Sequence, residues 1–339
     1  MKMILLLATT LMSWVLFHAF YLSGFEILSS PQTTLGLTSQ TASLKRNAVA
    51  CLPASAPVRG IEEISINDNR KPAGVLRNGI LFLNLEVRTG NWYPETHDGM
   101  PIKVYALAEA GKPLQIPGPL IRVPEGTEIQ ATVRNAVAAT TLMLHGFYSR
   151  PGNGKDSTAI PYGETYKVQF KPGVAGTYSY RVSANSFKRT NGLPYREDSQ
   201  LYGGFIVDGK SGEVDPDERI LMIGIWNDTL SGKFTFRGEE NVINGLSWPY
   251  TERFTYRFGQ KVNWRLINAS NQQHPMHLHG FYYTVNSRGN EDSDRIYHKK
   301  DRRLVVTEPL QPGENLSMTW EPNREGNWLF HCHTLVHIT

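Results

Sequence analysis

Cysteine is scarce in this chain of 339 residues, which contains only Cys51 and Cys332. Two cysteines cannot supply the several crosslinks of a disulfide framework, but a chain of this length can bury a hydrophobic core in each of two domains. Charge of one sign is also lacking, because the formal net charge is +4 and no basic run is interleaved with aromatic residues. We therefore exclude nucleic acid as an expected partner.

Charged side chains are missing from one long segment near the N-terminus. Residues 3–25 contain no Asp, Glu, Lys or Arg and are mostly apolar. That length lies between the core of a signal peptide and a membrane span, so residues 1–25 are predicted to be a signal peptide or an N-terminal membrane anchor. Either one predicts that the rest of the chain is exported, to the periplasm or the extracellular space. Residues 26–60, rich in Ser, Thr and Ala, are interpreted as a linker that carries Cys51 as a lone thiol.

A long helical period is lacking after residue 60. Short runs that alternate apolar and polar residues take its place, and Gly, Pro and Asn turns separate them. This pattern predicts an all-β sandwich or barrel. The clearest runs cover residues 80–87, 120–123, 128–133, 166–170 and 202–207.

The second half of the sequence repeats the first. The pairs at an offset of 150 are Gly163-Glu164 with Gly313-Glu314, Phe170 with Trp320, and Gly176-Thr177-Tyr178 with Gly326-Asn327-Trp328, and Leu144-His145-Gly146-Phe147 matches Leu278-His279-Gly280-Phe281 at an offset of 134. The repeat predicts two tandem β-sandwich domains over residues 61–209 and 215–339, joined near residues 209–217, where Gly, Pro and acidic residues cluster.

Six of the ten histidines fall in two short segments. The segments are His274-Pro275-Met276-His277-Leu278-His279-Gly280 and His331-Cys332-His333-Thr334-Leu335-Val336-His337. A thiolate with two imidazoles is the ligand set of a blue-copper electron-transfer site. Because side chains alternate along a strand, His331 and His333 should point to one side and Cys332 to the other. One strand could then serve two metal sites.

These segments resemble the last-domain signatures of multicopper oxidases, which are laccase-like proteins of cupredoxin fold with the pattern HPxHLHG followed by HCHxxxH. Both signatures are matched without a gap, and the repeat extends the likeness over roughly residues 75–339. The resemblance implies two tandem cupredoxin-like Greek-key sandwiches with copper as cofactor. It also implies one-electron oxidation of a reducing substrate, with relay to an interdomain copper cluster that reduces dioxygen.

Residue by residue, the resemblance assigns His274, Cys332 and His337 to the type 1 copper, in the second domain. Cys332, His331 and His333 would carry the electron onward and so take the catalytic part. The remaining ligands would be His277 at the type 2 copper, and His279, His331 and His333 with His145 of the first domain at the type 3 coppers.

The chain departs from the family pattern in its first domain. Met143 stands where the family has the first His of HxHG, and Arg181-Val182-Ser183 stands where it has HxH. Five of the eight expected trinuclear imidazoles remain. An alternative function is therefore a copper-binding electron-transfer protein with a degraded trinuclear site and no oxidase activity, and a third is a metal-free structural domain.

Several predictions concern what lies around the copper sites. The reductant could be a phenol, a metal ion or a redox protein, and two-domain family members that complete the cluster between subunits imply a homotrimer. His298, in a charged loop expected over residues 288–303, is not expected to bind metal. Because the chain stops two residues after His337, the second sandwich is expected to be incomplete. Either the sequence is a fragment of a longer chain, which is the favoured interpretation, or the type 1 site is open on its axial side.

Overall fold

The computed structural model describes residues 61–97, 99–152, 157–184, 199–227, 239–334 and 337. Every described strand lies in one compact unit of the chain, Pro57–Thr339. The predicted leader and the predicted linker with Cys51 lie outside the described residues. In the ranges that the structure does describe, no helix is long and apolar enough to cross a membrane.

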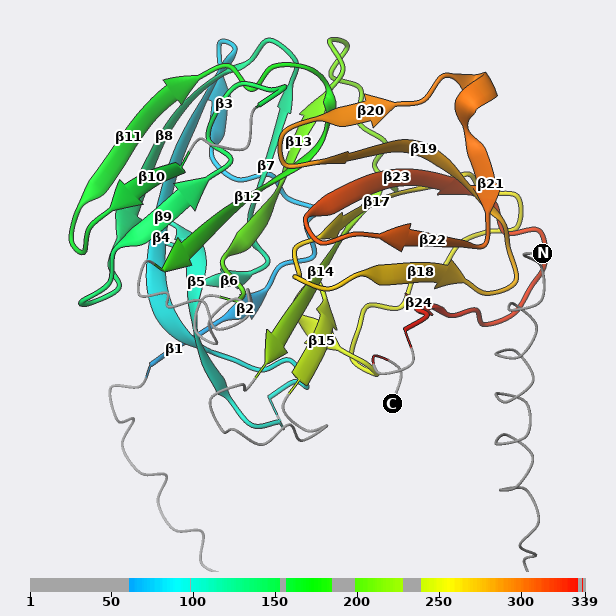
Figure 1. Ribbon diagram of the computed structural model, residues 1–339, viewed down its shortest axis with the longest axis horizontal. Coiled ribbons are helices and arrows are strands. Elements are labelled where there is room, and N and C mark those ends of the chain that lie inside the picture. The colour runs from blue at the N-terminus through cyan, green and yellow to red at the C-terminus, as the bar shows by residue number, and fades with distance from the viewer. Residues whose placement is uncertain are drawn as a thin grey trace, which may run out of the picture. The chain divides into compact units, whose positions relative to one another are not determined.

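The first half of this unit forms two sheets, coloured blue to green in Figure 1. Their strands are β1 (Glu62–Glu63), β2 (Ser65–Ile66), β3 (Val75–Arg77), β4 (Ile80–Trp92), β5 (Ile102–Glu109), β6 (Gln115–Ile116), β7 (Gly118–Pro124), β8 (Glu128–Asn135), β9 (Leu142–His145), β10 (Ser157–Ile160), β11 (Thr165–Phe170), β12 (Gly176–Ala184) and β13 (Tyr202–Asp208). One sheet has the order β11-β8-β4-β5-β6-β2, with β1 and β3 on β4, and the other has the order β10-β9-β12-β13-β7. Leu83, Val133, Tyr178 and Phe205 are fully buried in the core that these strands share.

The second half repeats this arrangement in yellow to red. Its elements are β14 (Arg219–Asn227), β15 (Glu239–Ile243), β16 (Leu246–Ser247), β17 (Val262–Asn268), β18 (His274–Leu278), β19 (Tyr283–Asn290), β20 (Asp294–Ile296), the 3-10 helix η2 (Lys299–Asp301), β21 (Arg303–Val305), β22 (Thr307–Leu310), β23 (Glu314–Trp320) and β24 (Phe330–Cys332). One sheet has the order β16-β15-β14-β17-β23-β19-β20, with β21 on β19, and the other has the order β22-β18-β24. Leu266, Tyr283, Val285 and Leu316 are fully buried in their core.

The prediction of an all-β fold built from sandwiches is confirmed. The five predicted runs lie within β4, β7, β8, β11 and β13, and each strand extends beyond its run. In β8, for example, Ile129, Ala131 and Val133 are buried while Gln130 and Thr132 are partly exposed. Alternating apolar residues therefore form strands here because one side of each strand faces the core.

The expected loop over residues 288–303 was wrong. β19 continues to Asn290, a tight turn follows, and β20 pairs back on β19. Asn290 Oδ1 accepts hydrogen bonds from the backbone amides of Asp292 (2.9 Å) and Ser293 (3.0 Å), which closes the turn. The charge of Arg288, which suggested a loop, is compensated inside the structure by Glu308 at 2.6 Å.

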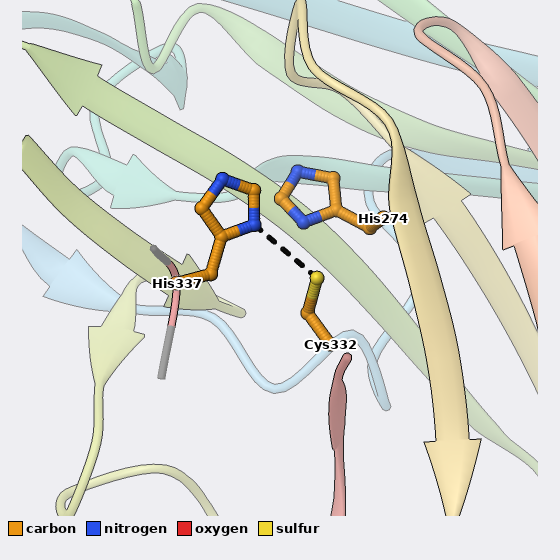
Figure 2. Close-up of side chains that lie close together, drawn as sticks. All are labelled: His274, Cys332 and His337. Carbon is orange, nitrogen blue, oxygen red and sulfur yellow. Dashed lines mark hydrogen bonds between the residues drawn. The ribbon is translucent and has the colours of Figure 1, made fainter. Parts of the chain in front are cut away.

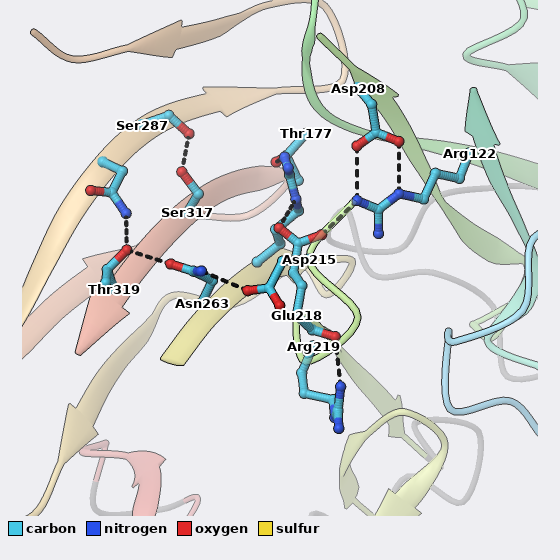
Figure 3. A network of polar contacts seen from close by, with 12 residues as sticks. Arg122, Thr177, Asp208, Asp215, Glu218, Arg219, Asn263, Ser287, Ser317 and Thr319 are labelled. Atoms are coloured by element: carbon cyan, nitrogen blue, oxygen red, sulfur yellow. Dashed lines mark hydrogen bonds and ion pairs between the residues drawn. The ribbon is translucent and has the colours of Figure 1, made fainter. Parts of the chain in front are cut away.

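Polar and apolar contacts join the two halves. Arg122 donates to both Asp208 oxygens at 2.8 Å and forms an ion pair with Glu218 at 2.9 Å. Figure 3 shows this network. Glu218 also accepts from Arg265 at 2.8 Å, and Arg265 donates to Thr177 at 2.7 Å. A buried apolar cluster spans both halves and contains Leu120, Tyr202, Ile206, Ile220, Met222 and Ile267. The proposed domain boundaries at residues 209 and 215 stay a prediction.

Candidate metal centre

Three of the predicted ligands lie together at one end of the second sandwich. His274 begins β18, Cys332 ends β24, and His337 follows shortly after it. Their ligand atoms all lie within 4.8 Å of one another, and Cys332 Sγ is 3.2 Å from His337 Nδ1. Figure 2 shows the three side chains gathered together, with a dashed line between Cys332 and His337. A soft thiolate and two imidazoles gathered in this way fit a copper ion of the blue type.

The ladder of β18 and β24 explains how residues so far apart in the sequence meet. Met276 pairs with Cys332 in this antiparallel ladder, and the backbone amide of His333 donates to Pro275 O at 2.7 Å. After the strand, the amide of Thr334 lies 3.4 Å from Cys332 Sγ. The amide of His337 then donates to Thr334 O at 3.0 Å, which turns the chain back and brings His337 beside the thiol.

The environment keeps the two imidazoles neutral at pH 7. Burial, together with the neighbouring His337, lowers the pKa of His274 to about 4. Burial also lowers the pKa of His337, although the carboxylate of Glu239 acts in the opposite direction. Neutral imidazoles retain the lone pair that a metal ion needs, so both side chains are ready to bind.

Four other predicted ligands, His277, His279, His331 and His333, form a second cluster, which we call the histidine quartet. The ring centroid of His277 lies 4.8 Å from that of His279, 5.7 Å from that of His331 and 5.2 Å from that of His333. His279 and His333 are exposed, and the Nε2 atoms of His279 and His331 are 2.9 Å apart. Cys332 instead packs against the core of its sandwich. His331 of β24 and His333, which follows the strand, therefore lie on one side of this segment, and the thiol of Cys332 lies on the other.

The first half of the chain offers a different environment. His145 ends β9 and lies opposite Arg181 of β12 in the ladder. Its Nε2 is 3.5 Å from Ser183 Oγ, and Arg181 Nε is 3.3 Å from Glu291 Oε2. With Met143 on the same strand, these side chains do not complete the trinuclear ligand set that the family resemblance implies.

Sequence reasoning missed the polar side chains that contact the histidines. Ser270 bonds to His274, Gln272 bonds to His337, and Thr307 bonds to His277 Nδ1 at 2.6 Å. The one available signal was the alternation of polar residues 270 and 272 before His274. Such a pattern is common in loops and does not by itself identify a site.

Comparison with known proteins agrees with this geometry. A family model described as "Multicopper oxidase" matches residues 223–339, and a second with the same description matches residues 112–212. The chain belongs to the multicopper oxidase family. Members of this family bind copper, so copper is the cofactor that membership assigns to the chain.

Relatives in the family are distant. A probable nitrite reductase-hydroxylamine oxidoreductase fusion protein of Kuenenia stuttgartiensis is 23% identical over 279 residues, which cover 77% of this chain and 30% of the relative. The multicopper oxidase mco of Staphylococcus aureus is 33% identical over 141 residues, which cover 37% of this chain and 30% of the relative. The matched part is thus about 30% of the length of either relative.

Solved structures show the same fold. The multicopper oxidase mgLAC has a TM-score of 0.58 at 22% identity, with 76% of this chain and 81% of that chain covered. The copper nitrite reductase of Nitrosomonas europaea has a TM-score of 0.59 at 19% identity, with 76% of this chain and 90% of that chain covered. The predicted cupredoxin-like fold is therefore confirmed.

Proposed function

We propose that this multicopper oxidase relative is a copper oxidoreductase that accepts single electrons from a reducing substrate at His274, Cys332 and His337. The observation that carries the proposal is the convergence of one thiol and two imidazoles within 4.8 Å. Copper held by these side chains would supply a one-electron redox centre. The reductant we propose is a phenol, a metal ion or a redox protein.

The same strand offers the electron a way out. Cys332 lies between His331 and His333, so a few covalent bonds of β24 separate its sulfur from two rings of the histidine quartet. His331 Nδ1 also lies 2.7 Å from Cys332 O, which holds that ring against the strand. We propose His331 and His333 as the relay toward a second metal site at the quartet, with dioxygen as the oxidant.

The absorption spectrum of the copper-loaded protein, prepared without the leader, tests the first step. Wild type and Cys51→Ala, which removes the other thiol, are expected to show an intense blue band that Cys332→Ala lacks. A near-ultraviolet shoulder from a bridged copper pair would support oxidase chemistry. A colourless wild type, or a blue Cys332→Ala, would contradict the proposal.

A second candidate is an electron-transfer protein that does not reduce dioxygen. The observation that favours it is the first-half environment, where Arg181 pairs with Glu291 and where Met143 and Ser183 replace imidazoles. Replacing Met143, Arg181 and Ser183 together with His would create dioxygen uptake if this candidate is right. The replacement would add little if the native protein is already an oxidase.

Assembly and location follow from the same proposal. Two imidazoles of the quartet, His279 and His333, are exposed, so other copies of the chain could complete this cluster. We therefore propose a homotrimer, which light scattering in solution tests. We also propose export to the periplasm or the extracellular space, with residues 1–25 as the targeting segment or anchor. Fractionation of cells that express the full chain separates an anchored form from a released one.

A further inference from the structure

The loop between β17 and β18, residues 269–273, contacts both imidazoles of the candidate copper site. Ser270 Oγ lies 2.8 Å from His274 Nε2, and Gln272 Oε1 lies 2.8 Å from His337 Nε2. Both contacts use Nε2, which leaves Nδ1 as the remaining ring nitrogen on each side. For His337 that nitrogen is the one 3.2 Å from Cys332 Sγ.

The partners of Gln272 fix which atom donates to which. Its amide nitrogen faces the Glu239 carboxylate, with Nε2 at 3.5 Å from Oε1 and 3.4 Å from Oε2. An ionised carboxylate only accepts hydrogen bonds, so the amide NH₂ must lie on that side and its oxygen must face His337. His337 is therefore the donor, and its proton is on Nε2.

Ser270 imposes the same state on His274. Its hydroxyl lies 2.7 Å from Asn268 Oδ1 and 3.2 Å from Gln272 O, and both of these oxygens only accept. The single hydroxyl hydrogen is thus directed to a carbonyl, and the oxygen accepts from His274 Nε2. With the proton of each imidazole on Nε2, Nδ1 carries the lone pair, which in His337 faces the Cys332 thiol at 3.2 Å.

The buried side chain of Asn268 holds this loop in place by hydrogen bonds. It is fully buried, and its amide nitrogen donates to Gln272 O (2.8 Å), Leu310 O (3.1 Å) and Gln311 O (3.0 Å). Its Oδ1 accepts from the amide of Ser270 at 3.0 Å. A satisfied buried amide of this kind restricts the loop to one conformation.

The first half of the chain contains the same frame without the polar contacts. Asn135 is also fully buried, donates to two backbone carbonyls at 2.8 Å, and accepts from the amide of Val137 at 2.9 Å. Two and four residues after Asn268 stand Ser270 and Gln272, but after Asn135 stand Val137 and Ala139. Both halves therefore contain the buried Asn and its backbone hydrogen bonds. The side chains of Ser270 and Gln272, which contact imidazoles, occur in the half that contains His274, Cys332 and His337.

We propose that Ser270 and Gln272 are positioning residues that set the tautomer of His274 and His337, so that both present Nδ1 to copper. This inference rests on the proposed function of the three-residue copper site. An acceptor on the far ring nitrogen orients a ligating imidazole and makes it a stronger donor. A stronger donor favours the more highly charged oxidation state, so Gln272 lowers the reduction potential of the site.

The first test needs no copper. Proton–nitrogen NMR of the imidazoles in the copper-free full chain reads the tautomer of His337. Wild type, Gln272→Glu, which keeps an acceptor oxygen, and Gln273→Ala, which changes the exposed neighbour, are expected to show the Nε2–H form. Gln272→Met keeps the volume but removes the acceptor, and is expected to give a mixture. A wild-type tautomer in Gln272→Met would overturn the proposal.

The second test uses copper. Gln272→Met is expected to bind copper about tenfold more weakly. If its preference for Cu(II) over Cu(I) also falls tenfold, the potential rises by about 59 mV for one electron. Gln272→Glu should stay at or below the wild-type potential, and Gln273→Ala should match wild type. A Gln272→Met potential equal to that of wild type would refute the role of Gln272.

The two tests separate this inference from the proposed function. If wild type binds no blue copper, the proposed function fails while the tautomer measurement still decides the role of Gln272. A urea-unfolding midpoint measured for each variant distinguishes loss of the contact from loss of the fold. If Gln272→Met does not fold, Gln272→Glu still tests the proposal. This variant is expected to keep the wild-type tautomer of His337, and a changed tautomer would contradict the proposal.

Discussion

Arg181 is the ladder partner of His145, and its guanidinium Nε lies 3.3 Å from the carboxylate of Glu291 in the turn between β19 and β20. In the sequence repeat Arg181 occupies the position that His331 occupies in the second half. A cation at that position would oppose metal binding, and here it forms an ion pair with the other half of the chain. The first-half counterpart of the histidine quartet has thus become a contact between the halves.

This ion pair is expected to contribute little to stability. The Arg181 side chain is 44% exposed and that of Glu291 is 23% exposed, so solvent screens their attraction. Arg181→Ala should lower the free energy of unfolding by about 1 kcal/mol or less, measured by urea denaturation. A loss of several kcal/mol would mean that the contact holds the halves together.

Glu218 should behave differently, because it is 9% exposed and bonded to both Arg122 and Arg265. Glu218→Gln leaves two largely buried guanidinium groups without their shared carboxylate. We expect a loss of about 3–5 kcal/mol in the free energy of unfolding. Arg134→Ala, which removes a pair whose Arg side chain is 58% exposed, is the control and should cost about 1 kcal/mol or less.

Asp294 is expected to make stability fall as the pH rises. Burial raises the pKa of Asp294 above 3.8, although the amide of Thr177, the hydroxyl of Ser287 and Arg265 act against it. At a pH between 3.8 and the pKa in the folded state, the folded state binds more protons than the unfolded state. The contribution of Asp294 to the free energy of unfolding is therefore complete below pH 3.8, and it is lost as the pH rises through the folded-state pKa. The free energy of unfolding of Asp294→Asn, measured relative to wild type by urea denaturation, should therefore be higher at pH 7 than at pH 3.5.

A second carboxylate gives the opposite slope and serves as control. Burial acts to raise the pKa of Asp68, but the hydrogen bonds from Arg70 outweigh it and the pKa is lowered. The contribution of Asp68 to the free energy of unfolding is present above the pKa of the unfolded state, and it is lost as the pH falls through the pKa of the folded state. The free energy of unfolding of Asp68→Asn, measured relative to wild type, should thus be lower at pH 7 than at pH 3.5. Slopes of the same sign for the two variants would refute one of the two assignments, and no pH dependence in either variant would refute both.

Tyr283 should matter to the strand that carries His274. Its side chain is fully buried, and its hydroxyl donates to Met276 O at 2.8 Å. Tyr283→Phe leaves that carbonyl without this donor and is expected to lower the free energy of unfolding by about 1 kcal/mol. Tyr282→Phe, at a residue that is 64% exposed, is the matched control and should be neutral in thermal or urea unfolding.

The sequence alone predicted the parts of the molecule that depend on local pattern. Alternating apolar residues predicted β8 because Ile129, Ala131 and Val133 face a core. The spacing of Cys332 and His337 predicted that they share a site, and a short turn after β24 does bring them together. These features are encoded within a few neighbouring residues, which explains why a single sequence suffices to find them.

Contacts between distant segments could not be predicted in this way. Leu144 lies opposite Val182, but its repeat counterpart Leu278 lies opposite Phe330, two residues before Cys332. Nothing in the sequence specifies this two-residue difference in register. The roles of Ser270, Gln272 and Glu291 likewise depend on which segments pack beside them, and as isolated letters they resemble any polar loop residues.

The alternation in β24 also limits how the strand can change. A slip of one residue against β18 would exchange the sides of the strand, so that the thiol faced solvent and imidazoles faced the core. A slip of two residues would preserve the sides and shift the site along the sheet. Insertions and deletions that reach this ladder should therefore be tolerated only in even numbers, and the copper centre and the histidine quartet would have to move together or not at all.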